Sequence, residues 1–391
     1  MNTISKTVMH YIQYYLGNTN TWIYGQIRHA VDWRHCIVTT KIENLDRFPF
    51  EPLYCTRKLA PARRLYNTVF NRLAGYYPLF LDAAKRERPL LIHAHFGQIG
   101  YKALGLARKI GVPLVTTFYG RDVSRLAQRE KYRRRYRVLF DRGDLFLAEG
   151  TAMKRALGAL GCPAEKVRVF HLGVDVDAYP FEVRKAPSSG PVVVLFAGTF
   201  TEKKGLIYAI RAFAQAVKTH GNTVMRIIGD GEDRAAVERL IADLGIGRLV
   251  EMLGFVDYAR LIEEMTRAHI FIHPSVTAAD GNTEGGAPVT IIDAEATGLP
   301  VASTFHADIP EVVLHEKTGL LSPEKDVDAL VENLSFLLDN PAAWASMGAA
   351  ARRHVEENYN IRTQGILLGK IYDAVIAGHA RDGTNENRNG A

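Results

Sequence analysis

The chain has 391 residues, of which 47% are hydrophobic and 23% are charged. This length exceeds the ~150 residues typical of one domain, and the composition excludes a disordered or fibrous protein. No stretch approaches the roughly 18–20 apolar residues needed to cross a bilayer, and the first 17 residues lack the apolar core of a secretory signal. Cys36, Cys55 and Cys162 are too far apart for a disulfide framework or a zinc motif. We therefore expect a soluble, two-domain protein of a reducing compartment.

The net charge of +7 is divided unevenly along the chain. Residues 1–185 hold 31 Lys and Arg against 15 Asp and Glu, whereas residues 186–391 hold 18 against 27. Such an asymmetry predicts that the first half binds an anionic partner: nucleic acid, a phosphate-bearing substrate or an acidic membrane surface.

Short apolar runs alternate with amphipathic helical stretches along most of the chain. The runs are continuous rather than alternating, as expected of parallel strands that are covered on both faces. We expect strands at residues 7–12, 90–95, 113–118, 145–148, 167–170, 192–197, 224–228, 269–273 and 300–303. Strand–helix alternation that occurs twice predicts an α/β protein with two doubly wound parallel sheets.

The boundary between the two domains is predicted from composition. Residues 183–191 (VRKAPSSGP) lack apolar periodicity and are typical of a linker. The first domain would then span residues 1–182 and the second residues 192–359. A last helix at 360–378 is expected to pack back on the first domain, and residues 379–391 are expected to form a disordered tail.

The loops that follow the strands of the second domain are the first candidates for a site, because doubly wound sheets bind ligands beyond the carboxyl ends of their strands. The turn from Gly198 to Gly205 contains Lys204 and leads into a helix, an arrangement suited to a diphosphate. A plain strand–helix turn with solvated lysines is the structural alternative. Weaker glycine signals are Gly229, Asp230 and Gly231, which follow the next strand, and Gly254 with Phe255 further along the chain.

The loop after residues 269–273 is the most informative. Small and polar residues lead into Glu284, two glycines and an apolar helix that contains Asp293. Backbone N–H groups at the start of that helix could meet ligand hydroxyls or phosphates, and Glu284 could accept hydrogen bonds from sugar hydroxyls or stabilise positive charge. An N-capping cluster is the structural alternative.

Polar residues also follow two strands of the first domain. His93 and His95 fall on one face of their strand, but no third ligand at metal-like spacing accompanies them, so we expect structural or acid–base histidines and no metal. Tyr119, Arg121 and Asp122 end the next strand and are expected in the same crevice.

The basic stretch 121–142 carries an apolar edge of Tyr132, Tyr136, Leu139 and Phe140 on one side of a predicted helix. Such a helix suits docking onto anionic lipid headgroups, and a solvated, half-packed helix is the structural alternative. No recognised nucleic-acid module accompanies the charge, so we expect no nucleic-acid partner.

Taken in order, phrases of this sequence resemble the family 4 retaining glycosyltransferases, from about residue 90 to 375. The phrases are residues 93–97, 117–122, 167–175, 202–205, 229–231, 273–275, 284–285 and 308–313. The run 284–292 is especially similar to bacterial exopolysaccharide transferases of the colanic-acid type. The resemblance implies the GT-B fold, in which two Rossmann-like domains face each other across a cleft.

The resemblance also implies a reaction: transfer of a sugar from a nucleotide-sugar, such as a UDP- or GDP-hexose, to a hydroxyl of a lipid-linked or polysaccharide acceptor. The anomeric configuration is retained, and neither a metal nor another cofactor is expected. Lys204 maps to the lysine that neutralises the diphosphate, Glu284 to an acid near the donor sugar, and Asp293 falls near the acid that holds the ribose.

The remaining candidate residues follow from this resemblance and from positions just after the predicted strands. The expected catalytic set is Glu284, Lys204, Asp122, Tyr119 and His95. The expected donor-binding set is Gly198, Thr199, Lys204, Gly229, Asp230, Gly231, Gly254, Phe255, Glu284, Gly286, Ala287, Pro288, Val289 and Asp293. Acceptor contacts are expected at Asn18, Thr19 and Arg121.

This sequence departs from the family at Tyr119, where the family has histidine, and at Thr199, where it has arginine. Asp293 replaces a glutamate and stands one residue further along. These departures leave open a catalytically degenerate scaffold that binds sugar-nucleotide without turnover; a sugar-nucleotide epimerase is a further alternative. The leading expectation is a cytoplasmic transferase, attached peripherally to the inner face of the cytoplasmic membrane through its basic first domain.

Overall fold

The computed structural model describes residues 6–17 and 20–389, and it divides into two units. Unit 1 is Met1–Gly173 with Ile361–Ala391, and unit 2 is Val174–Asn360. The expected linker 183–191 therefore belongs to unit 2. Within the described ranges, no helix is both long and apolar enough to cross a membrane.

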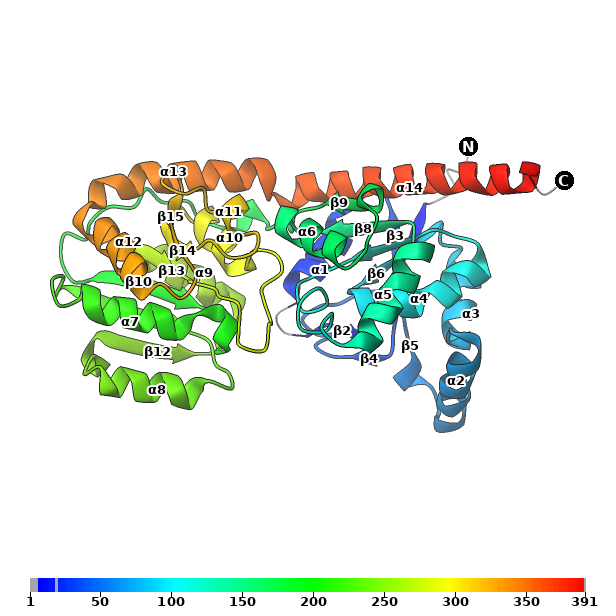
Figure 1. Cartoon of the computed structure of the whole chain (residues 1–391), viewed down its shortest axis with the longest axis horizontal. Coiled ribbons are helices and arrows are strands. Elements are labelled where there is room, and N and C mark those ends of the chain that lie inside the picture. The colour runs from blue at the N-terminus through cyan, green and yellow to red at the C-terminus, as the bar shows by residue number, and fades with distance from the viewer. Residues whose placement is uncertain (1–5, 18–19, 390–391) are drawn as a thin grey trace. The chain divides into compact units, whose positions relative to one another are not determined.

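The centre of unit 1 is a seven-stranded parallel sheet in the order β5-β3-β1-β6-β7-β8-β9 (Figure 1). Its strands are β1 (Thr7–Tyr11), β3 (Arg34–Thr39), β5 (Leu53–Cys55), β6 (Leu91–His95), β7 (Leu114–Thr117), β8 (Leu145–Ala148) and β9 (Val167–Val169). A separate short pair joins β2 (Tyr14–Tyr15) to β4 (Lys41–Ile42). The strand order reverses between β1 and β6, the kind of switch point at which doubly wound sheets bind ligands.

Helices cover both faces of this sheet. One face packs against α3 (Pro78–Glu87), α4 (Gly97–Ile110), α5 (Glu130–Arg142) and α6 (Thr151–Ala159). The other packs against α14 (Ile361–Asn389), the helix drawn in red in Figure 1. Its Leu368, Ile371 and Tyr372 lie among buried residues of β1, β6, β7 and β8. The remaining helices of unit 1 are α1 (Thr21–His29), α2 (Pro61–Ala74) and the short 3-10 helices Thr56–Lys58 and Ala164–Lys166.

Unit 2 repeats the design with a six-stranded parallel sheet in the order β12-β11-β10-β13-β14-β15. Its strands are β10 (Val192–Ala197), β11 (Thr223–Ile228), β12 (Val250–Gly254), β13 (Ile270–Ile272), β14 (Val301–Thr304) and β15 (Gly319–Ser322). The switch point falls between β10 and β13, so the loops after these two strands begin side by side.

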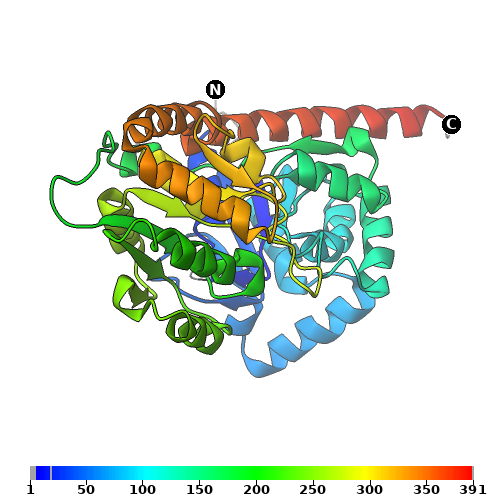
Figure 2. The same cartoon turned by 60° about the vertical axis from the view of Figure 1, so that its left-hand side comes forward.

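The helices of unit 2 also form two layers around the sheet (Figure 2). One buried cluster holds side chains of α7 (Leu206–Ala216), α8 (Arg234–Asp243) and α12 (Val327–Asp339). The other holds side chains of α9 (Tyr258–Arg267), α10 (Val289–Ala296) and α11 (Ile309–Val312), and α13 (Pro341–Asn358) contributes to both. Short 3-10 helices lie at Val176–Ala178, Glu202–Lys204 and Gly247–Leu249.

The predicted class, α/β with two doubly wound sheets, is confirmed, and each predicted apolar run contains a strand. Strands β2, β3, β4, β5, β12 and β15 were not predicted. The last helix continues through Asn389, into the segment 379–391 that was expected to be disordered.

Candidate functional site

A carboxylate and two lysines meet at the switch point of unit 2. Lys203 and Lys204 end the short 3-10 helix after β10, and Glu284 lies in the loop after β13. The Glu284 carboxylate lies 3.1 Å from the Lys203 ammonium and 3.0 Å from that of Lys204. Ser275 donates a hydrogen bond of 3.1 Å to the same carboxylate.

The cluster is nearly removed from solvent, because the exposed fraction is 21% for the Lys203 side chain, 16% for Lys204 and 6% for Glu284. Burial alone would raise the pKa of Glu284, but Lys204 and Lys203 together outweigh it and hold the pKa well below its usual range. Glu284 is therefore ionised at neutral pH, and both lysines share one negative charge.

Two neighbouring features fix this geometry. Gly205 has φ +70°, and a Cβ there would overlap the carbonyl oxygen of Pro274, so only glycine allows the two loops to approach so closely. The Glu284 backbone N–H donates to Nε2 of His306 at 3.1 Å, and Nδ1 of His306 lies 2.7 Å from Glu324. His306 thus connects the Glu284 loop to residues after β15.

Asp293 lies inside α10 and is 1% exposed. Its Oδ1 accepts hydrogen bonds from the hydroxyls of Tyr179 at 2.6 Å and Tyr258 at 3.2 Å, and the two hydroxyls also contact each other. Burial raises the pKa of Asp293 to about 7, and the two tyrosine hydrogen bonds act in the opposite direction. In the described part of the chain, the hydrogen bonds to this carboxyl all reach Oδ1.

The other expected donor residues occupy the loops beyond β10 to β13. Gly229 is buried with φ +130°, and a Cβ there would overlap the carbonyl oxygen of Gly198. Asp230 is exposed and pairs with Arg234, and Phe255 is 57% exposed. Gly254 is the last residue of β12, and the other positions lie in the same loops or at the start of α10: Thr199, Gly231, Gly286, Ala287, Pro288 and Val289.

Several side chains around Glu284 were not singled out from the sequence. Lys203, Ser275 and His306 each touch Glu284, although only Lys204 had been assigned a role. The ring of His273 is fully buried and stacks on Phe196, and within the described residues neither of its nitrogens has a hydrogen-bond partner. A polar residue directly after a buried strand of a doubly wound sheet is the signal that could have identified them.

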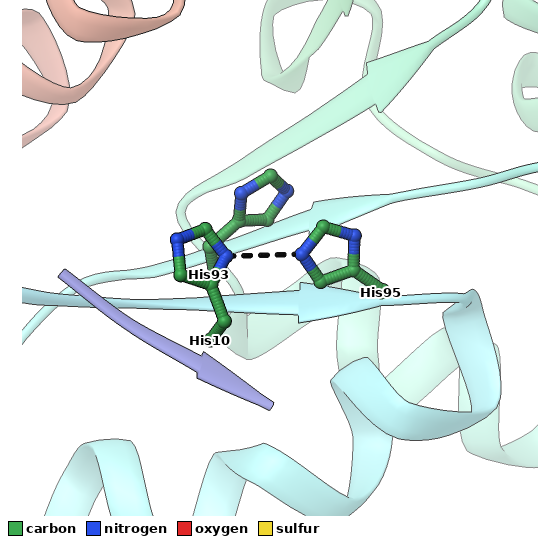
Figure 3. Close-up of side chains that lie close together, drawn as sticks. All are labelled: His10, His93 and His95. Carbon is green, nitrogen blue, oxygen red and sulfur yellow. Dashed lines mark hydrogen bonds between the residues drawn. The ribbon is translucent and has the colours of Figure 1, made fainter. Parts of the chain in front are cut away.

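In unit 1, His95 belongs to a row of buried imidazoles on the sheet face covered by α14 (Figure 3). His10 on β1 pairs across the ladder with His93 on β6. His10 lies 3.0 Å from His95 and 3.0 Å from His35, and Tyr119 lies 2.6 Å from His95. Burial lowers the pKa values of His10, His35 and His95, so these rings are neutral.

The hydrogen bonds assign a direction to this row. The carbonyl of Ala30 can only accept, so Nε2 of His35 carries its proton and Nδ1 of His35 accepts from His10. His10 then accepts from His95 through Nδ1, and His95 accepts from the Tyr119 hydroxyl. Oε1 of Gln26 lies 3.3 Å from the same hydroxyl and is a second acceptor for its single proton, so His95 at 2.6 Å is the nearer of the two acceptors.

The expectation that no third ligand accompanies His93 and His95 is wrong, because His10, His93 and His95 bring one nitrogen each within 4.8 Å of one another. The sequence hid His10 because only the pairing of β1 with β6 brings it there. The geometry nevertheless suits hydrogen bonds better than a metal. The rings of His93 and His95 stack at 4.4 Å and 28°, so their in-plane lone pairs do not converge, and His93 is bonded to Tyr372 and Thr117.

The remaining candidates of unit 1 differ in their surroundings. Asp122 is fully buried and accepts from the backbone N–H groups of Gly97 at 2.8 Å and Tyr119 at 3.0 Å. Burial raises the pKa of Asp122 to about 6. Its contacts make it an organiser of the two loops that follow β6 and β7, while Arg121 is exposed. Asn18 and Thr19 lie outside the described residues.

The apolar edge predicted on α5 does not face solvent. Tyr136, Leu139 and Phe140 are buried in the core of unit 1, and Tyr132 packs against that core. The exposed side chains of α5 are mostly charged, which matches the half-packed alternative.

Comparison with known proteins assigns this architecture to a family. Residues 34–178 match the family described as Glycosyltransferase Family 4, and residues 180–354 match Glycosyl transferases group 1. WcaL of Escherichia coli strain K12, a glycosyltransferase named for colanic acid biosynthesis, is 37% identical over 72% of this chain and 70% of its own length. The amylovoran biosynthesis glycosyltransferase AmsK of Erwinia amylovora is 36% identical over 68% of this chain and 65% of its own length.

Solved structures agree in fold. The Anabaena protein Alr3699/HepE, crystallised in complex with UDP, aligns over 94% of this chain and 100% of that chain, with a TM-score of 0.76 and 18% identity. A sucrose-phosphate synthase from Thermosynechococcus elongatus aligns over 95% and 100%, with a TM-score of 0.75 and 19% identity. The fold is therefore that of the GT-B glycosyltransferases. At the level of sequence, the chain belongs to glycosyltransferase family 4.

Proposed function

We propose that this glycosyltransferase transfers a hexose, with retention of configuration, from a UDP- or GDP-sugar to a hydroxyl of a lipid-linked or polysaccharide acceptor in exopolysaccharide synthesis. The names of the two bacterial relatives support the exopolysaccharide, and the UDP complex of the Anabaena protein supports a nucleotide donor. Unit 2 would bind the donor and unit 1 the acceptor.

The observation that carries this proposal is the cluster of Lys203, Lys204 and Glu284. When a donor diphosphate leaves the sugar, negative charge develops on its oxygens, and preorganised cations lower the free energy of that state. Both lysines are held in place by Glu284, so they lose little conformational freedom when a diphosphate arrives. A diphosphate that draws the ammonium groups toward itself would release the Glu284 carboxylate toward the sugar.

The remaining donor contacts follow from the same loops. The first N–H groups of α10, beside Gly286 and Ala287, would face the phosphates or sugar hydroxyls, and Oδ2 of Asp293 would accept from the ribose. Lysines and helix N-termini can neutralise the leaving group, so the proposal includes no metal.

The test is to replace Lys204 with alanine and Glu284 with glutamine. Each variant should lower kcat at least about a hundredfold, on the scale of losing one preorganised charge contact. Lys218→Ala, at an exposed position after α7, is the matched control and should leave kcat unchanged. Near-normal turnover in both site variants would refute the assignment. A thermal-shift screen with UDP-, GDP- and ADP-sugars would identify the base.

Tyr119 and Thr199 favour a second candidate, a scaffold that binds the nucleotide-sugar without turnover. Slow hydrolysis of the donor supports the enzyme, and binding without any product supports the scaffold. A product formed from the donor alone would instead indicate an epimerase.

We also propose a cytoplasmic location and peripheral attachment to anionic lipid. The excess of Lys and Arg over residues 1–185 supports this attachment.

A further inference from the structure

Helix α2 presents an apolar surface to solvent. Four large side chains within one nine-residue stretch are exposed: Leu65 by 65%, Tyr66 by 57%, Val69 by 46% and Leu73 by 84%. At about 100° per residue, these four side chains occupy one arc of roughly 100° on the helix. In the described part of the chain, no other helix exposes more than two large hydrophobic side chains.

The orientation of α2 is fixed by its opposite side. The side chain of Asn67 is the buried contact of the helix, and it accepts from the Leu79 backbone N–H at 2.9 Å. At the end of the helix, a Cβ on Gly105 of α4 would overlap the carbonyl of Gly75. In Figures 1 and 2, α2 lies at the periphery of its own unit, apart from the central sheet. Because the opposite side of α2 makes these contacts, the apolar arc faces solvent.

The charge around this arc is of one sign. Residues 52–81 contain five basic side chains and no acidic one. On the helical wheel, Arg72 borders one side of the arc and Arg63 borders the other, while Arg64 lies further round. The remaining two, Arg57 and Lys58, stand exposed just before the helix. An apolar strip flanked by arginines is complementary to an anionic lipid bilayer, in which negatively charged headgroups cover an apolar interior.

From this combination we propose that α2 is the element that docks the protein on anionic membranes. The helix would lie in the headgroup plane with Leu65, Val69 and Leu73 inserted between lipids and Arg63 and Arg72 on phosphates. The basic helix α5, the other candidate, lacks a free apolar edge, because Tyr136, Leu139 and Phe140 fill the core. The inference rests on the proposed peripheral attachment, and it names the surface responsible.

A single probe can report insertion directly. Cys36, Cys55 and Cys162 are buried, so Leu73→Cys offers one accessible thiol for an environment-sensitive fluorophore in the full chain. Vesicles of phosphatidylcholine with phosphatidylglycerol should shift the emission to the blue. The same label on Val31→Cys, an exposed position of the same unit, is the control and should not shift. Equal shifts at both positions, or none at residue 73, would overturn the proposal.

Charge and apolar contributions are separated by sedimentation with the same vesicles. The triple change Arg63→Gln, Arg64→Gln, Arg72→Gln should weaken binding about a hundredfold, and added salt should reduce the difference. The matched triple on α5, Arg134→Gln, Arg137→Gln, Arg142→Gln, removes the same charge and should cost less than threefold. Leu65→Ser with Leu73→Ser should weaken binding at least about tenfold, whereas Ile366→Ser on α14 should not.

The outcomes distinguish this inference from the attachment on which it depends. If the wild-type protein does not bind anionic vesicles, both the peripheral attachment and the role of α2 are refuted. Binding that both arginine triples weaken equally would leave the attachment and overturn the role of α2. Self-association that Leu65→Ser with Leu73→Ser abolishes, without vesicle binding, would assign the arc to a second copy of the chain. Activity on a soluble acceptor should be the same in all α2 variants.

Discussion

The buried carboxyl of Asp293 should make the stability of this protein fall as the pH rises. Its pKa is about 7 in the folded protein, against about 3.9 in an unfolded chain. Between these values the folded state holds a proton that the unfolded state has lost, so each pH unit should cost about 1.4 kcal/mol of unfolding free energy. The full effect is about 4 kcal/mol, complete at pH values above the folded pKa.

Asparagine at position 293 keeps the shape and cannot ionise, so the variant should lack this slope. Between about pH 5 and pH 8, the wild type should lose about 3 kcal/mol relative to Asp293→Asn. Urea unfolding of both proteins at a series of pH values measures the difference, and Asp243→Asn, on the exposed end of α8, is the matched control. Parallel pH profiles for the wild type and Asp293→Asn would show that the carboxyl is ionised throughout and would refute the reasoning.

Other substitutions test neighbouring features. Tyr179→Phe removes a hydrogen bond that lowers the pKa of Asp293, so the stability loss should continue to a higher pH; an unchanged profile would contradict the contact. Gly205→Ala should lower the Tm by several degrees, because its Cβ meets the Pro274 carbonyl and its φ is positive, whereas Gly245→Ala, positive in φ but with open space, should cost less. His10→Leu removes one hydrogen-bond partner from His95 and one from His35 and should cost about 3 kcal/mol, and Zn²⁺ should not raise the wild-type Tm; a rise would indicate a metal site instead.

The strands of the central sheets could be predicted from the sequence, because each lies between two helical layers and is apolar throughout. Strand β10, with six apolar residues in succession, is the clearest case. Strand β3 begins with Arg34 and His35, and β5 has only three residues, so neither pattern separates them from loops. Pairing in the sheet, where β5 forms the edge and β3 lies between β5 and β1, decides their structure rather than the local sequence.

Some residues of the candidate site could be predicted from the sequence and others could not. Lys204 and Glu284 could be singled out because both follow buried strands, and the fold brings them to a 3.0 Å contact. Lys203 also contacts Glu284, but the sequence could not predict this because it depends on the geometry of the short 3-10 helix Glu202–Lys204. His10 could not be identified, because its partner His93 is distant in the sequence and meets it only in the sheet. Periodicity also cannot tell whether an apolar helix edge meets a protein core or a lipid surface, and this is why α5 was misread while α2 was overlooked.

The return of α14 to the first sheet has a consequence for biosynthesis. One face of the first sheet emerges from the ribosome early, with the side chains of Val8, Leu91, Val115, Leu147 and Phe170. The side chains of α14 that cover this face are translated only after the whole of unit 2: Leu368, Ile371 and Tyr372. Until α14 has been synthesised, the nascent first unit keeps an uncovered apolar surface, which is a target for chaperones. Synthesis of α14 is thus the step after which this half of the enzyme can first close.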